Sequence, residues 1–393
     1  WQKKYKGRNE RIIFSEFVQN KLGIAKNLSM SWFTYAGYAN NGKSKDAQPL
    51  NLTAEKYIGG NYWQHYSKTA VFMRYLEHYL GEDKMDEILQ DFYRQWEFRH
   101  PYPEDLKAVF ATHIQEDLEW FFDNVFNKTT YVDYGIIKTG DQFILDNYGT
   151  FTCPVEVAFY NGSGQEIQRD WYHKIDNKKK LSLPSGAVSA RIDPDHHMPD
   201  VNRSNNSSKK SLNLNFVWDK PTYFNHDVNI VPWLFSYNYY NGFTPGLTIF
   251  SGFAPGYDGS GNVLSFLYDF NHKKPVGGFS ITRPIRSISL FHVSSLNIKL
   301  DRGSGRTGFN AGITGTIKEP YIKSPVARIN ANLFYHYLDS TALDTVLYDD
   351  GKFFIMSLGY SKKWELNIDS ELTFQIGIKT GKDFARSFLL GKV

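Results

Sequence analysis

The 393-residue sequence has a single cysteine, Cys153, so no internal disulfide can form. One thiol gives no information about the cellular compartment. No stretch reaches the roughly eighteen consecutive apolar residues that a transmembrane helix requires, which excludes such a helix. The excess of positive over negative charge is also small, because the formal net charge is +4 at pH 7, and no run of basic residues is longer than residues 178–180. A nucleic-acid partner is therefore not expected.

Aromatic residues, by contrast, are abundant. They make up 17% of the chain, with 26 tyrosines and 30 phenylalanines, and there are 31 glycines. This combination favours β structure with aromatic girdles. The length is enough for about two or three domains. The residue patterns predict a multidomain α+β protein, with a helical part over 1–130, a β-sandwich over 131–218 and long antiparallel strands over 219–393.

Residues 61–120 have a helical periodicity. In the first helix, apolar residues fall at i, i+3, i+4, i+7 and i+8, namely Phe72, Tyr75, Leu76, Tyr79 and Leu80. Gly81 ends this pattern, and the same period returns from Met85 to Trp96. Further helices are expected at 104–110 and 117–122. Before them, residues 12–18 predict a short helix, and a hydrophobic patch over 30–35 leads into a turn at 40–44.

This string of helices resembles the last helices of the catalytic domain in the gluzincin aminopeptidases, the zinc peptidases that include aminopeptidase N and leukotriene hydrolase. The matching features are Tyr66-Ser67-Lys68 at the start of a helix, P-E-D-L at 103–106 and D-L-E-W-F-F at 117–122. In that family the tyrosine donates its phenol proton to the oxyanion that forms when metal-bound water attacks a peptide carbonyl. The resemblance therefore implies that Tyr66 is a catalytic residue.

The zinc motif of that family is absent from this chain. The family binds zinc through H-E-x-x-H and a further glutamate, and none of the eleven histidines here is followed by Glu. In the family the motif lies upstream of the tyrosine, and only residues 1–65 precede Tyr66. We expect the chain to be a piece of a longer polypeptide whose zinc ligands are not in this chain, and a degenerate, metal-free relative is the alternative. Neither His65 nor the pair of His113 and Glu116 is expected to bind metal.

From residue 131 the period changes to two. Short strands are predicted at 134–137, 142–145, 155–160, 171–175, 180–183 and 188–192. Such strands predict an immunoglobulin-like β-sandwich, which also follows the catalytic helices in the aminopeptidase family. Residues 193–197 are expected to form a turn, and 202–210 a polar linker.

The strands after residue 219 are longer and have two different faces. Alternation of apolar and polar residues is clearest at 308–318, 327–337 and 372–379, and further strands are expected at 248–253, 263–270, 277–285, 287–300, 353–366 and 384–393. Strands of this length with one apolar face are typical of an outer-membrane β-barrel, since soluble strands average about five or six residues. These are about nine or ten strands, and the chain ends without the usual aromatic residue, so the barrel is expected to be incomplete.

Two functions of different class follow. Residues 237–243 resemble the segment ahead of barrels fused to peptidases in Bacteroidota-type bacteria. The first hypothesis is therefore that the chain is part of a zinc aminopeptidase-like protein, which is anchored in the outer membrane and hydrolyses peptide substrates on the periplasmic side. The alternative is a non-catalytic pseudo-peptidase that serves as an accessory subunit of an outer-membrane complex. A soluble β-rich binding protein is a third hypothesis.

Overall fold

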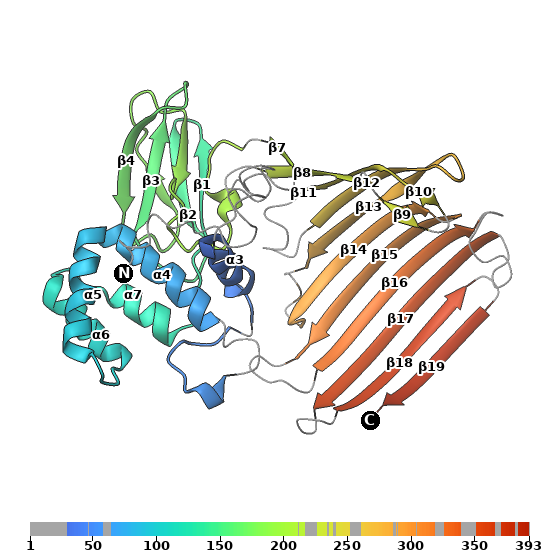
Figure 1. Cartoon of the computed structure of the whole chain (residues 1–393), viewed down its shortest axis with the longest axis horizontal. Coiled ribbons are helices and arrows are strands. Elements are labelled where there is room, and N and C mark those ends of the chain that lie inside the picture. The colour runs from blue at the N-terminus through green and yellow to red at the C-terminus, as the bar shows by residue number, and fades with distance from the viewer. Residues whose placement is uncertain are drawn as a thin grey trace. The chain divides into compact units, whose positions relative to one another are not determined.

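The computed structural model describes residues 30–45, 47–57, 64–210, 212–216, 226–233, 236–238, 241–251, 261–285, 288, 290–303, 305–318, 326–338, 351–365, 371–381 and 384–392. These residues form two compact units (Figure 1). Unit 1 contains the described residues up to Lys210, and unit 2 contains those from Leu212 onward. The helix predicted at 12–18 lies outside the described residues.

Unit 1 begins with helices. They are α3 (Met30–Gly42), the short 3-10 turn η1 (Ala54–Lys56), α4 (Gln64–Leu80), α5 (Glu82–Trp96), α6 (Pro103–His113), α7 (Glu119–Phe122) and the π-helical turn η2 (Asp123–Asn127). The four predicted helices from α4 to α7 are confirmed. The turn predicted at 40–44 begins later, because α3 continues to Gly42. Gly81 separates α4 from α5 with a φ of 90°, a left-handed conformation that glycine adopts without strain.

The core of the helical part is aromatic. Phe72 of α4 is completely buried, its ring meets Tyr38 of α3 edge-on at 5.4 Å, and on another side it meets Phe151 at 5.2 Å. The hydroxyl of Tyr75, also on α4, donates to the Pro154 carbonyl oxygen. Helix α4 is therefore held between α3 and the loop that leads into the sandwich strands.

The rest of unit 1 contains two three-stranded antiparallel sheets and the short 3-10 turn η3 (Arg203–Asn205). One has the order β1-β2-β5, from β1 (Tyr134–Thr139), β2 (Gln142–Asn147) and β5 (Lys179–Leu181). The other has the order β4-β3-β6, from β3 (Val155–Tyr160), β4 (Glu166–Tyr172) and β6 (Ser189–Ile192). The buried rings of Phe143 and Phe159 meet across the two sheets at 5.6 Å. A strand is found at each of the six predicted places, although β4 begins earlier, at Glu166, and ends at Tyr172, so residues 173–175 of the predicted strand lie outside it.

Residues 202–210 are not the solvated linker that the sequence predicts. Arg203 is only 3% exposed, and its guanidinium carbon lies 3.9 Å from the centre of the Tyr35 ring. Its Nη2 atom donates to the Met198 carbonyl oxygen at 2.8 Å. The carbonyl of the fully buried Asn206 accepts from the Ile192 backbone N–H at 2.8 Å. Arg203 can be buried here because its guanidinium donates to a backbone carbonyl oxygen and lies 3.7 Å from the Asp193 carboxylate.

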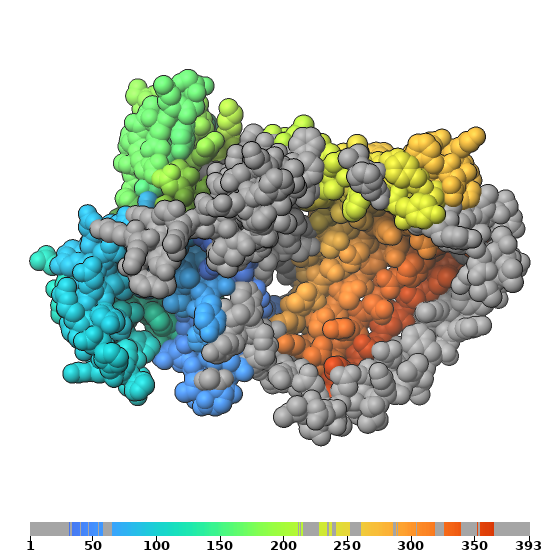
Figure 2. Space-filling model, in the orientation of Figure 1, coloured from blue at the N-terminus to red at the C-terminus, as the bar shows by residue number. Residues whose placement is uncertain are grey.

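Unit 2 is an eleven-stranded sheet with the order β19-β18-β17-β16-β15-β14-β13-β12-β11-β8-β7. Its strands are β7 (Leu212–Phe216), β8 (His226–Trp233), β11 (Gly246–Ser251), β12 (Gly261–Asp269), β13 (Lys274–Pro284), β14 (Val293–Gly303), β15 (Arg306–Ile317), β16 (Val326–Leu338), β17 (Gly351–Glu365), β18 (Glu371–Gly381) and β19 (Phe384–Lys392). All neighbours are antiparallel except β7 and β8, which are parallel. A small hairpin of β9 (Tyr237–Asn238) and β10 (Gly242–Phe243) lies outside this sheet. Figure 2 shows β14 to β17 as one continuous surface.

The strand register gives this sheet one apolar and one polar face. On the apolar face, Leu333 lies opposite Ala311 and Met356, and two residues further along Tyr335 lies opposite Phe309. Large apolar side chains of this face are substantially exposed, namely Phe266, Leu300, Ile313, Tyr335, Phe354, Met356 and Leu358.

Asparagine and glycine alternate across the polar face. Asn332 lies opposite Gly312, and Asn330 lies opposite Gly359. A Cβ atom on either glycine would lie 2.3 Å from the Oδ1 atom of its asparagine. These glycines therefore leave room for the amide side chains of the neighbouring strand.

The predicted long antiparallel strands are confirmed, and closure into a barrel stays a prediction. Among the described residues the sheet is open, with β7 and β19 at its two ends. The strand predicted at 287–300 is shorter than expected, because β14 begins at Val293. No helix in the described part of the chain is long and apolar enough to cross a membrane.

Candidate functional site

Tyr66 lies on the first turn of α4, and its side chain is 68% exposed. The next two residues face the other way, since Ser67 and Lys68 are both buried. This follows from helix geometry, in which Ser67 is rotated from Tyr66 by about 100° around the axis and Lys68 by about 200°. The first turn therefore presents one phenol to the outside while its opposite side packs into unit 1.

The segment beside Tyr66 is held by several contacts. The imidazole of His65 lies edge-on against the Tyr57 ring at 4.3 Å. The Tyr57 hydroxyl donates to the Pro49 carbonyl oxygen at 2.5 Å, and the Gln48 amide donates to the Lys56 carbonyl oxygen at 3.1 Å. Residues 48–57 thus form a hydrogen-bonded support against which the start of α4 packs.

Lys68 is the unusual residue of this turn, because a lysine side chain is rarely buried. Only 5% of it is exposed, and its ammonium donates to the Lys128 carbonyl oxygen at 3.1 Å. The same nitrogen lies 5.9 Å from the centre of the Phe72 ring. Burial lowers the pKa of Lys68 to about 8, because the charged form loses its hydration.

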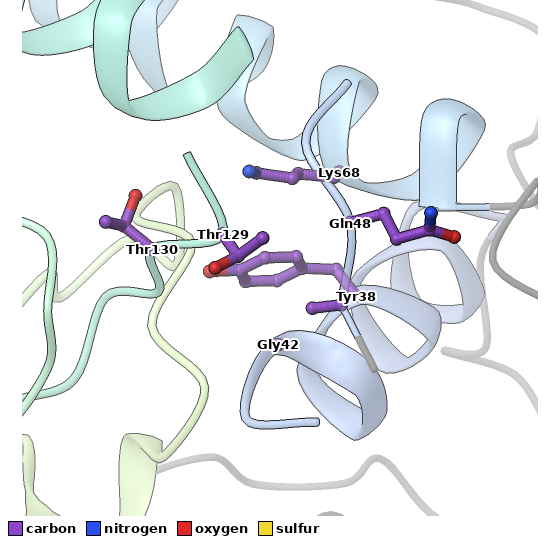
Figure 3. Close-up of a pocket in the computed structure, with 7 residues that line it drawn as sticks. Tyr38, Gly42, Gln48, Lys68, Thr129 and Thr130 are labelled. Carbon is purple, nitrogen blue, oxygen red and sulfur yellow. The ribbon is translucent and has the colours of Figure 1, made fainter. Parts of the chain in front are cut away.

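A small pocket lies next to the Lys68 ammonium. Its lining residues are Tyr38, Gly42, Ala47, Gln48, Lys68, Thr129 and Thr130 (Figure 3). In Figure 3 the Lys68 side chain and the Tyr38 hydroxyl point toward Thr129 and Thr130, whereas the Gln48 amide points away from the ammonium. The room inside suffices for about one water molecule, so the pocket is too small for a peptide.

The described residues do not fit a zinc site. Among them, no group of three His, Cys, Asp or Glu side chains could hold a metal ion. The two residues of the H-x-x-E pair contact different partners. The Nε2 atom of His113 lies 2.8 Å from the Asp91 carboxylate, and the Glu116 carboxylate accepts a hydrogen bond from the Tyr79 hydroxyl at 2.8 Å.

A histidine pair that the sequence patterns did not predict joins α4 to the sandwich. His78 of α4 stacks on His197 with ring centres 4.1 Å apart, and its Nε2 atom lies 3.2 Å from the Glu156 carboxylate. The hydrogen bond to Glu156 raises the pKa of His78. Burial, together with the nearby charge of His78, lowers the pKa of His197 to about 4. His197 belongs to the turn predicted at 193–197, which is confirmed, with Asp193 and His196 at positive φ.

Comparison with known proteins gives a slight likeness to a solved structure. No family model matches the sequence, and no curated protein does. A solved structure of Legionella pneumophila aminopeptidase A in complex with aspartic acid matches part of the chain, with a TM-score of 0.33 and 14% sequence identity. The match covers 41% of this chain and 20% of that protein. A TM-score this low does not establish a common fold.

Proposed function

We propose that this protein is a peptidase of the gluzincin aminopeptidase class, held in the outer membrane of a Bacteroidota-type bacterium by unit 2. Unit 1 faces the periplasm and hydrolyses peptides there. The zinc ligands that this class requires would come from residues outside those that the structure describes, because the described residues do not fit such a site. The proposal therefore assigns a role only to this chain's own residues.

The observation that carries the proposal is the exposed phenol of Tyr66 on the first turn of a well-supported helix. When a peptide carbonyl is attacked, negative charge develops on its oxygen. A fixed neutral donor aimed at that oxygen stabilises the transition state more than the bound substrate. Tyr66 donates the phenol hydrogen bond to this oxyanion. His65, which precedes it, and Lys68, two residues after it, are both in contact with the surrounding structure, which supports a fixed position for the phenol.

The two-faced sheet of unit 2 supports the membrane part of the proposal. Lipid offers no hydrogen bonds to a backbone, so spanning strands pair with each other and turn apolar side chains outward. The face with Leu333, Met356 and Leu358 meets lipid, and the face with Asn330 and Asn332 lines a wet interior. Closing the sheet into a barrel removes its two open edges.

Hydrolysis by the full-length protein tests the proposal. We expect release of the N-terminal residue from an aminoacyl reporter, no release from the same reporter with a blocked amine, and loss of activity with a zinc chelator that added zinc restores. The protein is purified in detergent from the outer-membrane fraction. A full-length protein that cleaves none of a panel of aminoacyl reporters, with zinc present, contradicts the proposal.

A non-catalytic accessory subunit is the second candidate, and one surface feature favours it. Helix α5 exposes Leu89 and Tyr93, and the residues that follow include Phe98, which is 100% exposed at a φ of 59°, and Tyr102. Exposed large apolar side chains often mark interaction sites. Co-purification of stoichiometric outer-membrane subunits with an inactive protein, lost on substituting Phe98 and Tyr102 by serine, favours this candidate over the enzyme.

A further inference from the structure

We propose that Lys68 is a positioning residue for Tyr66, because its bond to the Lys128 carbonyl oxygen fixes the turn of α4 that presents the phenol. This inference rests on the proposed function. Lys68 does not itself touch substrate, since its side chain is buried on the opposite side of the helix from Tyr66. It acts through the backbone that both residues share.

The burial of Lys68 calls for an explanation. Its side chain lies among Tyr38, Ala47 and Thr129 in a pocket with room for about one water molecule. Taking an ammonium out of water costs free energy, which the lowered pKa of Lys68 reflects. A methionine, which is only one atom shorter than lysine, is suited to an apolar helix face without that cost. A buried lysine with one directed hydrogen bond provides a link with a defined direction, which an apolar side chain cannot.

The acceptor of this bond is itself well fixed. The Lys128 ammonium pairs with Asp123 at 2.5 Å on the preceding turn. Two residues later the Thr130 hydroxyl donates to the Asn124 carbonyl oxygen at 3.0 Å, and the Asn51 backbone N–H donates to the Phe126 carbonyl oxygen at 2.9 Å. The segment 123–130 is therefore a firm anchor for the start of α4, whereas helix ends without such an anchor fray.

The link matters for catalysis because an oxyanion donor works only over a short range. Misplacing a catalytic group by about 1 Å costs on the order of a hundredfold in rate. Tyr66 and Lys68 lie on the same helical turn, two residues apart, so a shift of the turn moves the phenol directly. Substrate contacts elsewhere are unaffected, and the loss therefore falls on kcat rather than on KM.

A double-mutant cycle with full-length protein tests the proposal. Lys68→Met removes the ammonium at similar length, and we expect it to lower kcat about tenfold to a hundredfold with KM within about twofold. In the Tyr66→Phe background, Lys68→Met should cause no further loss, since its effect requires the phenol. Lys84→Met, which removes an exposed ammonium paired with Glu87 at 2.8 Å on α5, is the matched control and should change neither constant. An equal loss in both backgrounds overturns the proposal.

A second readout separates this proposal from the proposed function. If the wild-type protein hydrolyses no reporter, the proposed function fails and the position of Tyr66 is then measured directly, with 3-fluorotyrosine at this site. We expect Lys68→Met to shift or broaden the fluorine resonance and Lys84→Met to leave it unchanged. Lys68→Gln, whose amide nitrogen ends one bond short, replaces Lys68→Met if the latter does not fold. An unchanged resonance in the Lys68 variant overturns the proposal.

Discussion

Leu358 and Ser357 provide a direct test of the lipid-facing surface. They are neighbours in the middle of β17, so their side chains point to opposite faces of the sheet. Leu358 lies opposite Ala331, is 57% exposed and belongs to the apolar face, whereas Ser357 accepts a 3.4 Å hydrogen bond from the Asn332 amide on the polar face. An arginine at the middle of a lipid-facing strand costs about 2–4 kcal/mol of unfolding free energy, which corresponds to about 30-fold to 700-fold in the folding equilibrium. We therefore expect this loss for Leu358→Arg and less than about 1 kcal/mol for Ser357→Arg.

The assay is urea unfolding of the full chain in phosphatidylcholine vesicles, followed by tryptophan fluorescence. Flotation of the vesicles shows how much protein is bound to them. Equal losses in the two variants would refute the assignment of the faces. A wild-type chain that stays folded in buffer without detergent and does not float with vesicles would refute the membrane location itself.

Two further predictions concern unit 1. Phe72→Ala should lower the free energy of unfolding by about 3–5 kcal/mol, because the completely buried ring contacts Tyr38 and Phe151. Thermal or urea unfolding measures this loss, with Leu89→Ala as a control at an exposed position. The pKa of His197 is lowered to about 4, so between pH 6.5 and 4 the unfolded state binds more protons than the native state. As the pH falls through this range, the wild-type protein therefore loses free energy of unfolding relative to His197→Gln. The loss is about 1 kcal/mol, because the half-buried imidazole is screened by solvent, and parallel stability curves for the two proteins would contradict it.

In unit 1 the sequence predicted those helices and strands whose signals come from residues close together in the chain. Helices α4 and α5 follow from the spacing of their apolar residues and from Gly81, whose φ of 90° few other residues adopt. The buried region at 202–210 could not be predicted in this way. Arg203 is covered by the ring of Tyr35, which is distant in the sequence, and its guanidinium donates to the nearby Met198 carbonyl oxygen. A polar composition alone does not reveal this packing and instead indicates a solvated linker.

The same distinction applies to the candidate site. The burial of Lys68 has a sequence signal, because Lys68 stands four residues before Phe72 and so lies on the apolar side of α4. Its partner has none, since every residue has a backbone carbonyl and nothing marks that of Lys128. The stacking of His78 on His197 likewise depends on how α4 packs against the sandwich. Alternation predicted the long strands from β11 to β19, but it predicted neither β7 and β8 nor their parallel pairing.

The turnover of Tyr66→Phe in the full-length protein tests the central claim most directly. Only a hydroxyl is lost from an exposed side chain, so the fold is retained, and Tyr93→Phe on α5 is a matched control with an exposed phenol. We predict that Tyr66→Phe lowers kcat for an aminoacyl reporter by about a hundredfold or more, the usual effect of losing one oxyanion donor, with KM little changed and Tyr93→Phe at the wild-type rate. A Tyr66→Phe protein that turns over as fast as wild type would remove Tyr66 from the mechanism.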